Sequence, residues 1–549
     1  MKTTRKNLPL LQLASNKKID TMSSMKLHLI GFGVLVLLFI GTIFLRSDEF
    51  SRDMGGRHEW ITAHSLTTME IWDKNGGPSA FGFNPVYSYP EAIQLKRQAM
   101  GGVKGENGLH YYTSYPPFAF IFGYYATQLM GGPSVDSIRV LNYLIHFACG
   151  FILFLILYEL MPDKKRFNLA GVIAATLYFY STGFLWGHGF LYFSDMLEQL
   201  LIILCIYVLI RFWKGKFKKN IYGYGLLFLV FFLATYTEWL GLFFSFFTGL
   251  AFLLFFFIKK NKSFLFGFFT VGLAASLALG TTVLQYSSIG GWDQLVEVST
   301  KKYNIRSGRV VDDPNHKLHI DNEETHDLMR RAFDMNYKNI QNIIGAVGIA
   351  FVPFLFIGKL RRRMTDIQLP ILVISLLLLS LICHYYIFFN FNALHSFSGL
   401  KTGMFITLII SILVLYIYQS MPNVKAMAIC AVLISGFVVF KMYGELDRYK
   451  SAAAKGYHDL ATPARTIGEL NDPNKGVFAN VPFHAVNLYY SKRDWFWIRD
   501  TATVSTFMTF FKLEEADYFH IEGGKVTEKL EYRSENKQAI LLNKEVISH

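Results

Sequence analysis

The sequence carries little charge for its length. Asp, Glu, Lys and Arg make up 17% of its 549 residues, whereas apolar residues make up 52% and Phe alone occurs 52 times. A soluble chain could not bury so much aromatic surface, because single hydrophobic cores stop growing near about 250–300 residues. The scarcity of charge therefore excludes an ordinary soluble globular protein.

Cysteine is also scarce. The four cysteines all fall within apolar runs, and none has the spacing of a metal ligand set: Cys149, Cys205, Cys383 and Cys430. We interpret them as small buried apolar residues, which excludes a disulfide framework and a zinc site. Nucleotide-binding loops are missing as well, because Gly290-Gly291 and Gly523-Gly524 lack the strand and helix context of such loops.

Long uncharged runs are what the sequence has in abundance. A run of roughly 20 apolar residues crosses a bilayer as a helix. We predict about eleven membrane-spanning helices, at about 26–46, 138–160, 168–187, 195–213, 221–238, 240–258, 264–285, 340–358, 369–389, 399–419 and 424–442. The sequence therefore predicts an α-helical polytopic membrane protein.

The run Pro116–Met130 is shorter and opens with a proline, which favours the start of a helix. A full crossing here would move every later basic loop to the other side of the membrane. We therefore expect an interfacial or half-inserted helix on the outer side, and an ordinary span is the alternative.

The net charge of +14 does not indicate nucleic-acid binding. Lys and Arg cluster in short loops between apolar runs, at 163–166, 211–219, 259–262 and 359–363. Cytoplasmic loops carry an excess of Lys and Arg, so we expect these four loops in the cytoplasm. The basic residues 1–25 then form a cytoplasmic leader, and it stays attached because no small-residue cleavage site follows the first apolar run.

Three segments are expected on the outer side: loops at about 47–115 and 286–338, and a tail at 443–549. The tail has strand-like runs that alternate with helical patterns, which favours a small α/β domain. The strand-like runs are Gly476–Val481, Ala539–Leu542 and one near Tyr518–Ile521.

Ionisable residues near membrane depth are the informative ones in such a protein. The first outer loop carries His58-Glu59-Trp60 and His64, at the start of an amphipathic pattern that predicts a helix through about Trp72. Glu59 is either a general base in a cleft or a solvated acid beside a tryptophan interface anchor. Tyr112 and Tyr115 precede two prolines and either line a sugar or lipid site or belong to the interfacial aromatic belt.

Further polar residues lie at the expected outer ends of later spans. Asp195 and Glu198 are three residues apart and share a helix face. Lys401 is either a phosphate partner or a lysine that snorkels to the interface. His188 also lies at such an outer end. Five ionisable residues are together predicted on one side of the membrane at one depth, whereas unrelated surface residues would scatter over both faces: Glu59, Asp195, Glu238, His395 and Lys401.

This pattern resembles the GT-C superfamily of membrane glycosyltransferases, in the branch of the protein O-mannosyltransferases and the aminoarabinose transferase of lipid A. The architecture is similar over about 26–440, whereas the motifs cover only about 57–66 and 111–118. The resemblance implies a sugar donor linked to a polyprenyl phosphate or diphosphate, a hydroxyl acceptor on a glycan, lipid or protein, and inversion at the anomeric carbon.

The resemblance also implies roles for residues. Glu59 matches the first-loop carboxylate that acts as general base, although this branch more often has Asp there, and Asp53 is the alternative. Asp195 matches a second-loop acid that positions a substrate. The residues expected to contact substrate are His58, His64, Tyr112, Tyr115, His188, Glu238, His395 and Lys401.

The expected setting is a bacterial inner membrane with the C-terminal domain periplasmic or extracellular. No nucleic acid is expected as a partner, and no cofactor is required, although a divalent cation stays open. Two other functions are considered. A transporter or flippase for a lipid-linked sugar would place charges near the midplane and show inverted repeats, and a scaffold would tolerate replacement of Glu59 and Asp195.

Overall fold

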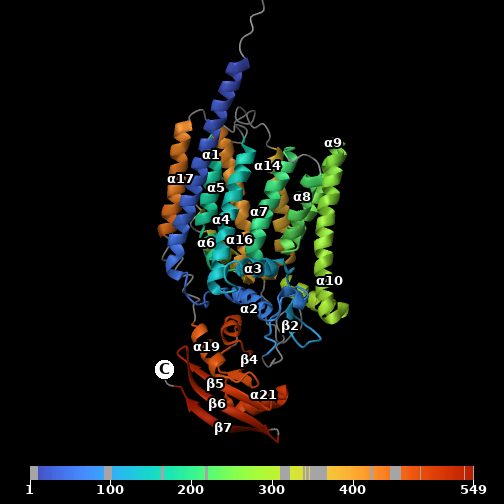
Figure 1. Cartoon of the computed structure of the whole chain (residues 1–549), viewed down its shortest axis with the longest axis vertical. Helices are drawn as coiled ribbons and strands as arrows, with labels where there is room; N and C mark the ends of the chain where they lie inside the picture. Colours follow the sequence, from blue (N-terminus) through green and yellow to red (C-terminus); the bar gives the residue numbers. More distant parts are fainter. Residues whose placement is uncertain are drawn as a thin grey trace, which may run out of the picture.

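The computed structural model describes most of the chain. It covers residues 10–91, 102–161, 166–216, 221–308, 322–337, 340, 341, 345, 368–420, 424–444, 459–482, 484–536 and 538–547. The molecule is elongated, with a helical bundle at one end and a C-terminal sheet at the other (Figure 1). The predicted span at 340–358 lies almost wholly outside the described residues.

The bundle consists of apolar helices that match the predicted spans in order. They are α1 (Leu10–Arg46), α4 (Val135–Leu160), α5 (Leu169–Tyr180), α6 (Thr182–Phe190), α7 (Ser194–Trp213), α8 (Ile221–Thr235), α9 (Trp239–Lys259), α10 (Lys262–Arg306), α14 (Gln368–Ile387), α16 (Leu400–Ser420) and α17 (Val424–Gly444). Seven helices in the described part of the chain are long and apolar enough to cross a membrane, and the bent pair α5–α6 adds an eighth. The α-helical membrane class is thereby confirmed, while the predicted number of spans stays a prediction.

Three segments differ in detail from the expected course of the chain. The helix α1 begins at Leu10, ahead of the predicted span 26–46, and its membrane-crossing part is Lys26–Glu49, in agreement with that span. The predicted span 168–187 is broken at Ser181, whose extended backbone turns the chain by 62° between α5 and α6. The predicted outer loop 286–338 is largely helical, because α10 continues to Arg306 across a kink at Gly290 and Gly291, and α11 follows at Asn322–Tyr337.

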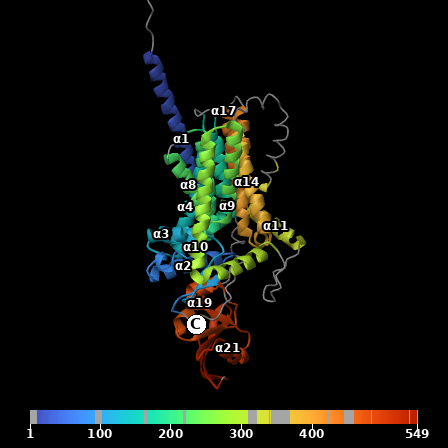
Figure 2. The ribbon, with the colours of Figure 1, turned by 90° about the vertical axis from the view of Figure 1, so that its right-hand side faces the viewer.

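Two helices lie across the end of the bundle that faces the C-terminal sheet (Figures 1 and 2). They are α2 (Trp60–Lys74) and α3 (Phe118–Gln128). The eleven residues of α3 extend about 16 Å, roughly half of the ~30 Å apolar core of a bilayer. This length is too short for a full crossing, and the half-inserted placement stays a prediction.

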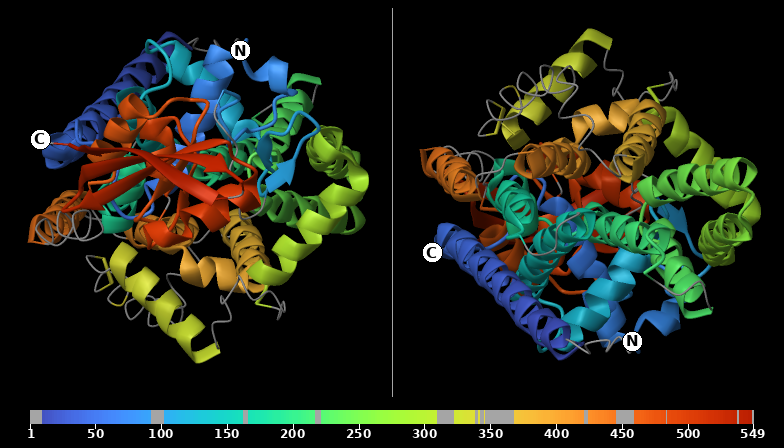
Figure 3. Two further views of the ribbon diagram at one scale, coloured as in Figure 1. Left: turned by 90° about the horizontal axis from the view of Figure 1, so that it is seen from below. Right: turned by 90° about the horizontal axis from the view of Figure 1, so that it is seen from above.

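The same end of the bundle, where α7, α9 and α16 begin and α14 ends, is called the sheet end below. The described basic residues at the loops used for orientation lie at the opposite end, where α7 and α9 end and α5 and α10 begin: Arg166, Arg211, Lys216, Lys259, Lys260 and Lys262. Seen along the bundle, α11 lies at its periphery (Figure 3), where it contacts α15 (Phe389–Leu394), the turn Ser396–Gly399 and α6.

The C-terminal region is a five-stranded mixed sheet with helices on both faces. The strand order is β4-β3-β5-β6-β7, with β3 parallel to both of its neighbours and the other pairs antiparallel. The strands are β3 (Gly476–Ala479), β4 (Trp495–Trp497), β5 (Glu515–Glu522), β6 (Lys525–Glu535) and β7 (Gln538–Val546). The predicted strands are present, and β4 and β6 were missed; β6 is rich in charged residues.

The alternation of side chains along these strands explains why helices pack on both faces of the sheet. Successive side chains of a strand point to opposite faces. Phe478 and Tyr518 lie on the face of the sheet that α21 (Val504–Phe511) covers. Val477 and Phe519 lie on the opposite face, which α19 (Ala461–Leu470) covers. The remaining helix, α20 (Ala485–Ser491), packs on α2 and connects this region to the bundle.

Three of the four cysteines are described, and all three are free thiols. Cys149 and Cys205 are buried in the bundle core, as predicted, whereas Cys383 is only partly buried. A short hairpin in the first loop, β1 (Gly102–Lys104) and β2 (His110–Tyr112), leads into the tyrosine and proline segment.

Candidate functional site

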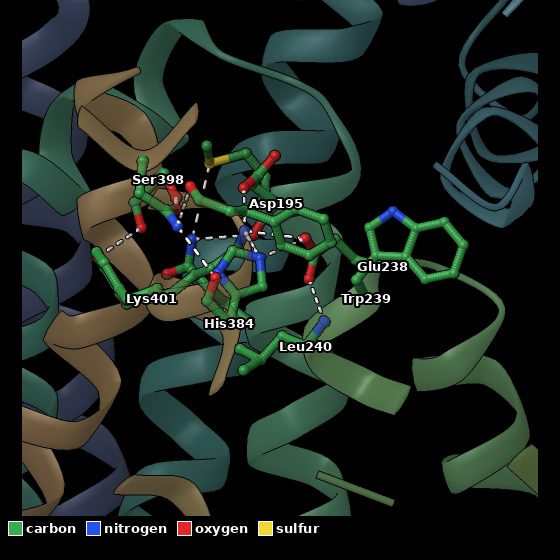
Figure 4. Close-up of polar contacts among 12 residues, drawn as sticks. Asp195, Glu238, Trp239, Leu240, His384, Ser398 and Lys401 are labelled. Carbon is green, nitrogen blue, oxygen red and sulfur yellow. Dashed lines mark hydrogen bonds and ion pairs between the residues drawn. The ribbon is translucent and has the colours of Figure 1, made fainter. Parts of the chain in front are cut away.

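A buried group of charged residues joins four helices at the sheet end (Figure 4). The charge cluster consists of Asp195, Glu198, Glu238, His384 and Lys401, all of them buried. The Lys401 Nζ atom lies 2.7 Å from Asp195 Oδ1, 3.0 Å from Glu238 Oε1 and 3.1 Å from His384 Nε2. His384 Nε2 also lies 3.0 Å from Glu238 Oε1. The structure thus brings together Asp195, Glu238 and Lys401, as the sequence predicted, and adds His384.

Helix ends place these side chains. Asp195 lies in the first turn of α7, and Glu238 caps the start of α9, where its Oε2 accepts a hydrogen bond of 2.6 Å from the Leu240 N–H. A carboxylate at a helix start satisfies an otherwise unpaired N–H and interacts favourably with the helix dipole. Lys401 follows at the beginning of α16, and His384 lies in the last turn of α14.

The expected contact of Lys401 with a lipid phosphate is not supported by this position. Its side chain has no exposed surface and already pairs with two carboxylates. A buried ammonium with two anionic partners has no unneutralised charge left for a phosphate. Glu238 is likewise occupied by Lys401, His384 and its own helix start.

An aromatic wall lies beside the charge cluster and contains most of the other residues predicted to bind substrate. It consists of His58, Trp60, His64, Tyr87, Tyr112, Tyr115, Phe391, His395 and Phe397. Neighbouring ring centroids lie 4.5 to 6.3 Å apart. Phe193, two residues before Asp195, contacts Tyr112 and Tyr115 and so links the wall to the cluster.

Two of the three histidines of the aromatic wall, His58 and His395, have lowered pKa values and are neutral at physiological pH. Burial lowers the pKa of His58 to about 3, with smaller contributions from His395 and Arg57. Burial also lowers the pKa of His395 to about 4, and the charge of Arg306 adds to this effect. Both rings therefore offer neutral donors and acceptors, and neither supplies a positive charge.

Two cations that the sequence analysis did not select lie against this wall. Lys302 Nζ donates to Thr113 Oγ1 at 2.9 Å and sits 5.9 Å from the Tyr112 ring. Arg306 donates to the Ser114 carbonyl at 3.3 Å and stacks over Tyr115 at 5.0 Å. Within the described residues neither cation has a carboxylate at ion-pair distance.

Their spacing of four residues was the available signal. It places Lys302 and Arg306 on one face only if the segment is helical, and 286–338 was expected to be a loop.

Glu59 is enclosed in a clamp. Its Oε2 accepts hydrogen bonds from the Gly55 N–H at 2.7 Å, the Gly56 N–H at 2.6 Å and Arg52 Nη1 at 2.9 Å. Its Oε1 lies 2.8 Å from Arg52 Nη2 and 3.7 Å from Arg139 Nη2. Arg139 also donates to the carbonyls of Phe50 and Arg52. The carboxylate is buried and holds the turn of the first loop together.

Asp53 points the other way, toward the C-terminal region. Arg465 Nη1 and Nη2 lie 2.8 and 2.5 Å from its two oxygens, and the Tyr490 hydroxyl donates to Oδ1 at 3.2 Å. The hydrogen bonds and charge of Arg465 lower the pKa of Asp53, against the opposing effect of burial. Asp53 is partly exposed and stays ionised, so the alternative carboxylate of the sequence analysis is the more accessible of the two.

His188 lies apart from both groups. It is buried in α6, where its Nε2 is 3.0 Å from the Tyr178 hydroxyl and its ring stacks on His146 at 4.9 Å. This environment is typical of a core histidine and does not support the predicted contact with substrate. As the side chains stand in the described part of the chain, with Lys401 in place, no group of three His, Cys, Asp or Glu residues is arranged to hold a metal ion.

Comparison with known proteins identifies the fold. No protein-family model matches the sequence, and no curated protein sequence is similar to it. Solved structures do match: ArnT from Cupriavidus metallidurans in the apo state, at 9% identity and a TM-score of 0.51, over 90% of this chain and 92% of that one. The archaeal oligosaccharyltransferase AglB from Archaeoglobus fulgidus, in complex with an inhibitory peptide and a dolichol-phosphate, matches at 11% identity and a TM-score of 0.52, over 89% and 69%.

Both are GT-C proteins. The chain has the GT-C fold. The likeness extends over the helical bundle and the C-terminal region, because about nine-tenths of the chain is covered. At such low identity the GT-C likeness concerns the fold, and the chemistry has to be argued from the residues of this chain.

Proposed function

We propose that the protein is a glycosyltransferase that moves a sugar from a polyprenyl-phosphate-linked donor to a hydroxyl acceptor. The reaction takes place at the sheet end, which we assign to the outer face because the described basic loop residues lie at the opposite end. The membrane is proposed to be a bacterial inner membrane, with the C-terminal sheet outside.

The observation that carries this proposal is the pair of cations against the aromatic wall. Burial and the charge of Arg306 lower the pKa of Lys302. An anionic phosphate would favour the charged form of this amine, so Lys302 and the guanidinium of Arg306 on one helix face are a suitable partner for a phosphate. Lys302 and Arg306 have no carboxylate at ion-pair distance among the described residues, unlike Lys401. The rings of Tyr112 and Tyr115 beside them offer flat apolar faces and hydroxyls of the kind that can hold a sugar.

The proposed step needs a base and a way to stabilise the leaving phosphate. The oxygen of the acceptor hydroxyl attacks the anomeric carbon, and Asp53 takes the proton of that hydroxyl as the attack proceeds. The bond from that carbon to the donor phosphate breaks, and the electron pair stays on the phosphate. Lys302 and Arg306 stabilise the charge that grows on the phosphate. We assign Glu59 a positioning role, since its oxygens are engaged by Arg52 and two backbone N–H groups.

The donor site is tested by binding. The purified chain in nanodiscs is titrated with a fluorescent polyprenyl phosphate, as wild type and as the double variant Lys302→Ala, Arg306→Ala. We expect the double variant to lose at least tenfold in affinity. Lys301→Ala is the matched control, because Lys301 is exposed on the same helix; it should bind as wild type does. Equal affinity of all three proteins would contradict the assignment.

The role of Asp53 predicts a shift in pH dependence. Arg465 lowers the pKa of Asp53, so wild-type kcat/KM should fall only when the pH drops below the lowered value. In Arg465→Ala the pKa rises toward its ordinary value of about 3.9, and the acid limb of the profile moves to higher pH. Lys492→Ala breaks a different contact of the C-terminal region, that with Glu70, and should leave the acid limb in place. An acid limb unchanged in Arg465→Ala would remove Asp53 from the role of base.

A transporter is the second candidate, and the structure gives it less support. Transport of a charged headgroup favours ionisable groups near the midplane. The charge cluster lies at the sheet end instead, and four of its five members, Asp195, Glu238, His384 and Lys401, are paired with one another.

A further inference from the structure

The charge cluster has a composition that is unusual for an ion pair. The ammonium of Lys401 is surrounded by two carboxylates and an imidazole, and all three contacts are 2.7 to 3.1 Å long. Asp or Glu oxygens together with a His nitrogen are the ligands with which proteins hold zinc and related divalent ions, usually with three protein ligands and one water. The three ligands come from three different helices and converge on one point.

The charges of the cluster show why a cation is needed at that point. Asp195, Glu198 and Glu238 are all buried, and Lys401 is their buried cation. Glu198 lies one turn after Asp195 on α7, and neither of its oxygens has a hydrogen bond. Buried carboxylates are costly unless a positive charge or a proton compensates them. The cluster therefore has more acid than one ammonium neutralises, which is the surplus that a divalent ion would match.

We propose that Lys401 is the built-in cation of a metal-type site, and that its ammonium occupies the position where Asp195, Glu238 and His384 would otherwise hold a divalent ion. Lys401 thereby fixes the beginnings of α7, α9 and α16 and the end of α14. Because Phe193 at the start of α7 contacts Tyr112 and Tyr115, Lys401 is a positioning residue for the aromatic wall. The charge cluster takes no metal ion in the wild-type protein, since the ammonium fills it.

The substitution Lys401→Ala tests this directly. It removes the ammonium and four methylene groups, which leaves room for an ion and a water beside the three ligands. Metal–ligand bonds are about 2.0–2.2 Å long, so each ligand has to move by about an ångström or less. The full chain is purified in nanodiscs and titrated with Co²⁺, whose visible absorption reports its coordination, and with Zn²⁺ while Tm is followed.

The expected Tm values and Co²⁺ spectra differ between the wild-type protein and the variants. Lys401→Ala should melt below wild type, bind about one Co²⁺ per chain with visible bands, and regain part of its Tm with Zn²⁺. Wild type should show neither bands nor a shift in Tm. The double variant Lys401→Ala, His384→Gln should lose the bands, because one of the three ligands is gone. These readouts need no sugar donor, so they are decided separately from the proposed transfer reaction.

Two results would overturn the proposal. In the first, the Lys401→Ala variant folds but responds to no divalent ion. In the second, the wild-type protein is purified with one metal ion per chain, and the substitution Glu238→Gln removes that ion. If Lys401→Ala cannot be purified even with Zn²⁺ present, a second pair decides. Lys401→Met leaves the carboxylates without a cation, and adding Glu238→Gln removes one of those charges. The pair should therefore melt higher than Lys401→Met alone, and a lower Tm of the pair would contradict the role of Lys401 as their cation.

Discussion

Glu59→Gln is expected to destabilise the protein by about 3–5 kcal/mol, the usual cost of breaking a buried ion pair from one side. The change removes the negative charge that faces Arg52 at 2.8 Å and Arg139 at 3.7 Å. It leaves two guanidinium groups near a neutral amide, and Arg139 is itself buried. If the amide oxygen keeps the hydrogen bonds from Gly55 and Gly56, the amide NH₂ faces the guanidinium groups of Arg52 and Arg139, and a donor then faces donors. The first loop should open, and Tm should fall by several degrees.

A matched control separates this effect from a general loss of charge. Glu49 also pairs with Arg52, at 3.3 Å, but its side chain is partly exposed. Exposed pairs contribute about 0–1 kcal/mol, so Glu49→Gln should change Tm little. Both variants are compared by thermal unfolding and by protease cleavage of the first loop. If Glu59→Gln is as stable as Glu49→Gln but inactive, Glu59 is the base after all and the clamp is secondary.

Asp53→Asn is expected to have the largest effect on catalysis. Loss of a general base lowers the rate by about 10²–10⁴-fold, while the partly exposed position of Asp53 predicts little change in Tm. The measurement is a single-turnover rate with saturating donor and acceptor, so that weaker binding does not contribute. Asp48→Asn, an exposed acid in the same loop, should react at the wild-type rate. A wild-type rate for Asp53→Asn would exclude Asp53 as the base.

The sequence predicted the membrane class and the order of the helices because apolar length alone decides both. The course of the chain was not predicted at points where the backbone torsions of one or two residues decide it. Ser181 is a small residue that hydropathy does not distinguish from its neighbours, yet its extended conformation bends the chain between α5 and α6. Gly290 and Gly291 are a turn signal in sequence, but here they form a kink that α10 passes through.

The site was predicted as a set of residues at one depth, and its pairing could not be predicted. Lys401 and Asp195 are more than two hundred residues apart, so their contact depends on how α7 and α16 pack, and no local pattern records that. Glu59 illustrates the converse. Its motif is visible in the sequence, but the arginine that reaches it from α4, Arg139, is not, and this contact changes the role that the structure supports.

Turnover tests the central claim most directly. The purified chain in a lipid bilayer is supplied with a polyprenyl-phosphate-linked sugar and a mixture of hydroxyl acceptors, and free polyprenyl phosphate is measured over time. We predict that wild type releases it, and that the double variant Lys302→Ala, Arg306→Ala releases it at least tenfold more slowly. Donor that stays intact but crosses the bilayer with wild type would contradict glycosyl transfer and identify a transporter instead.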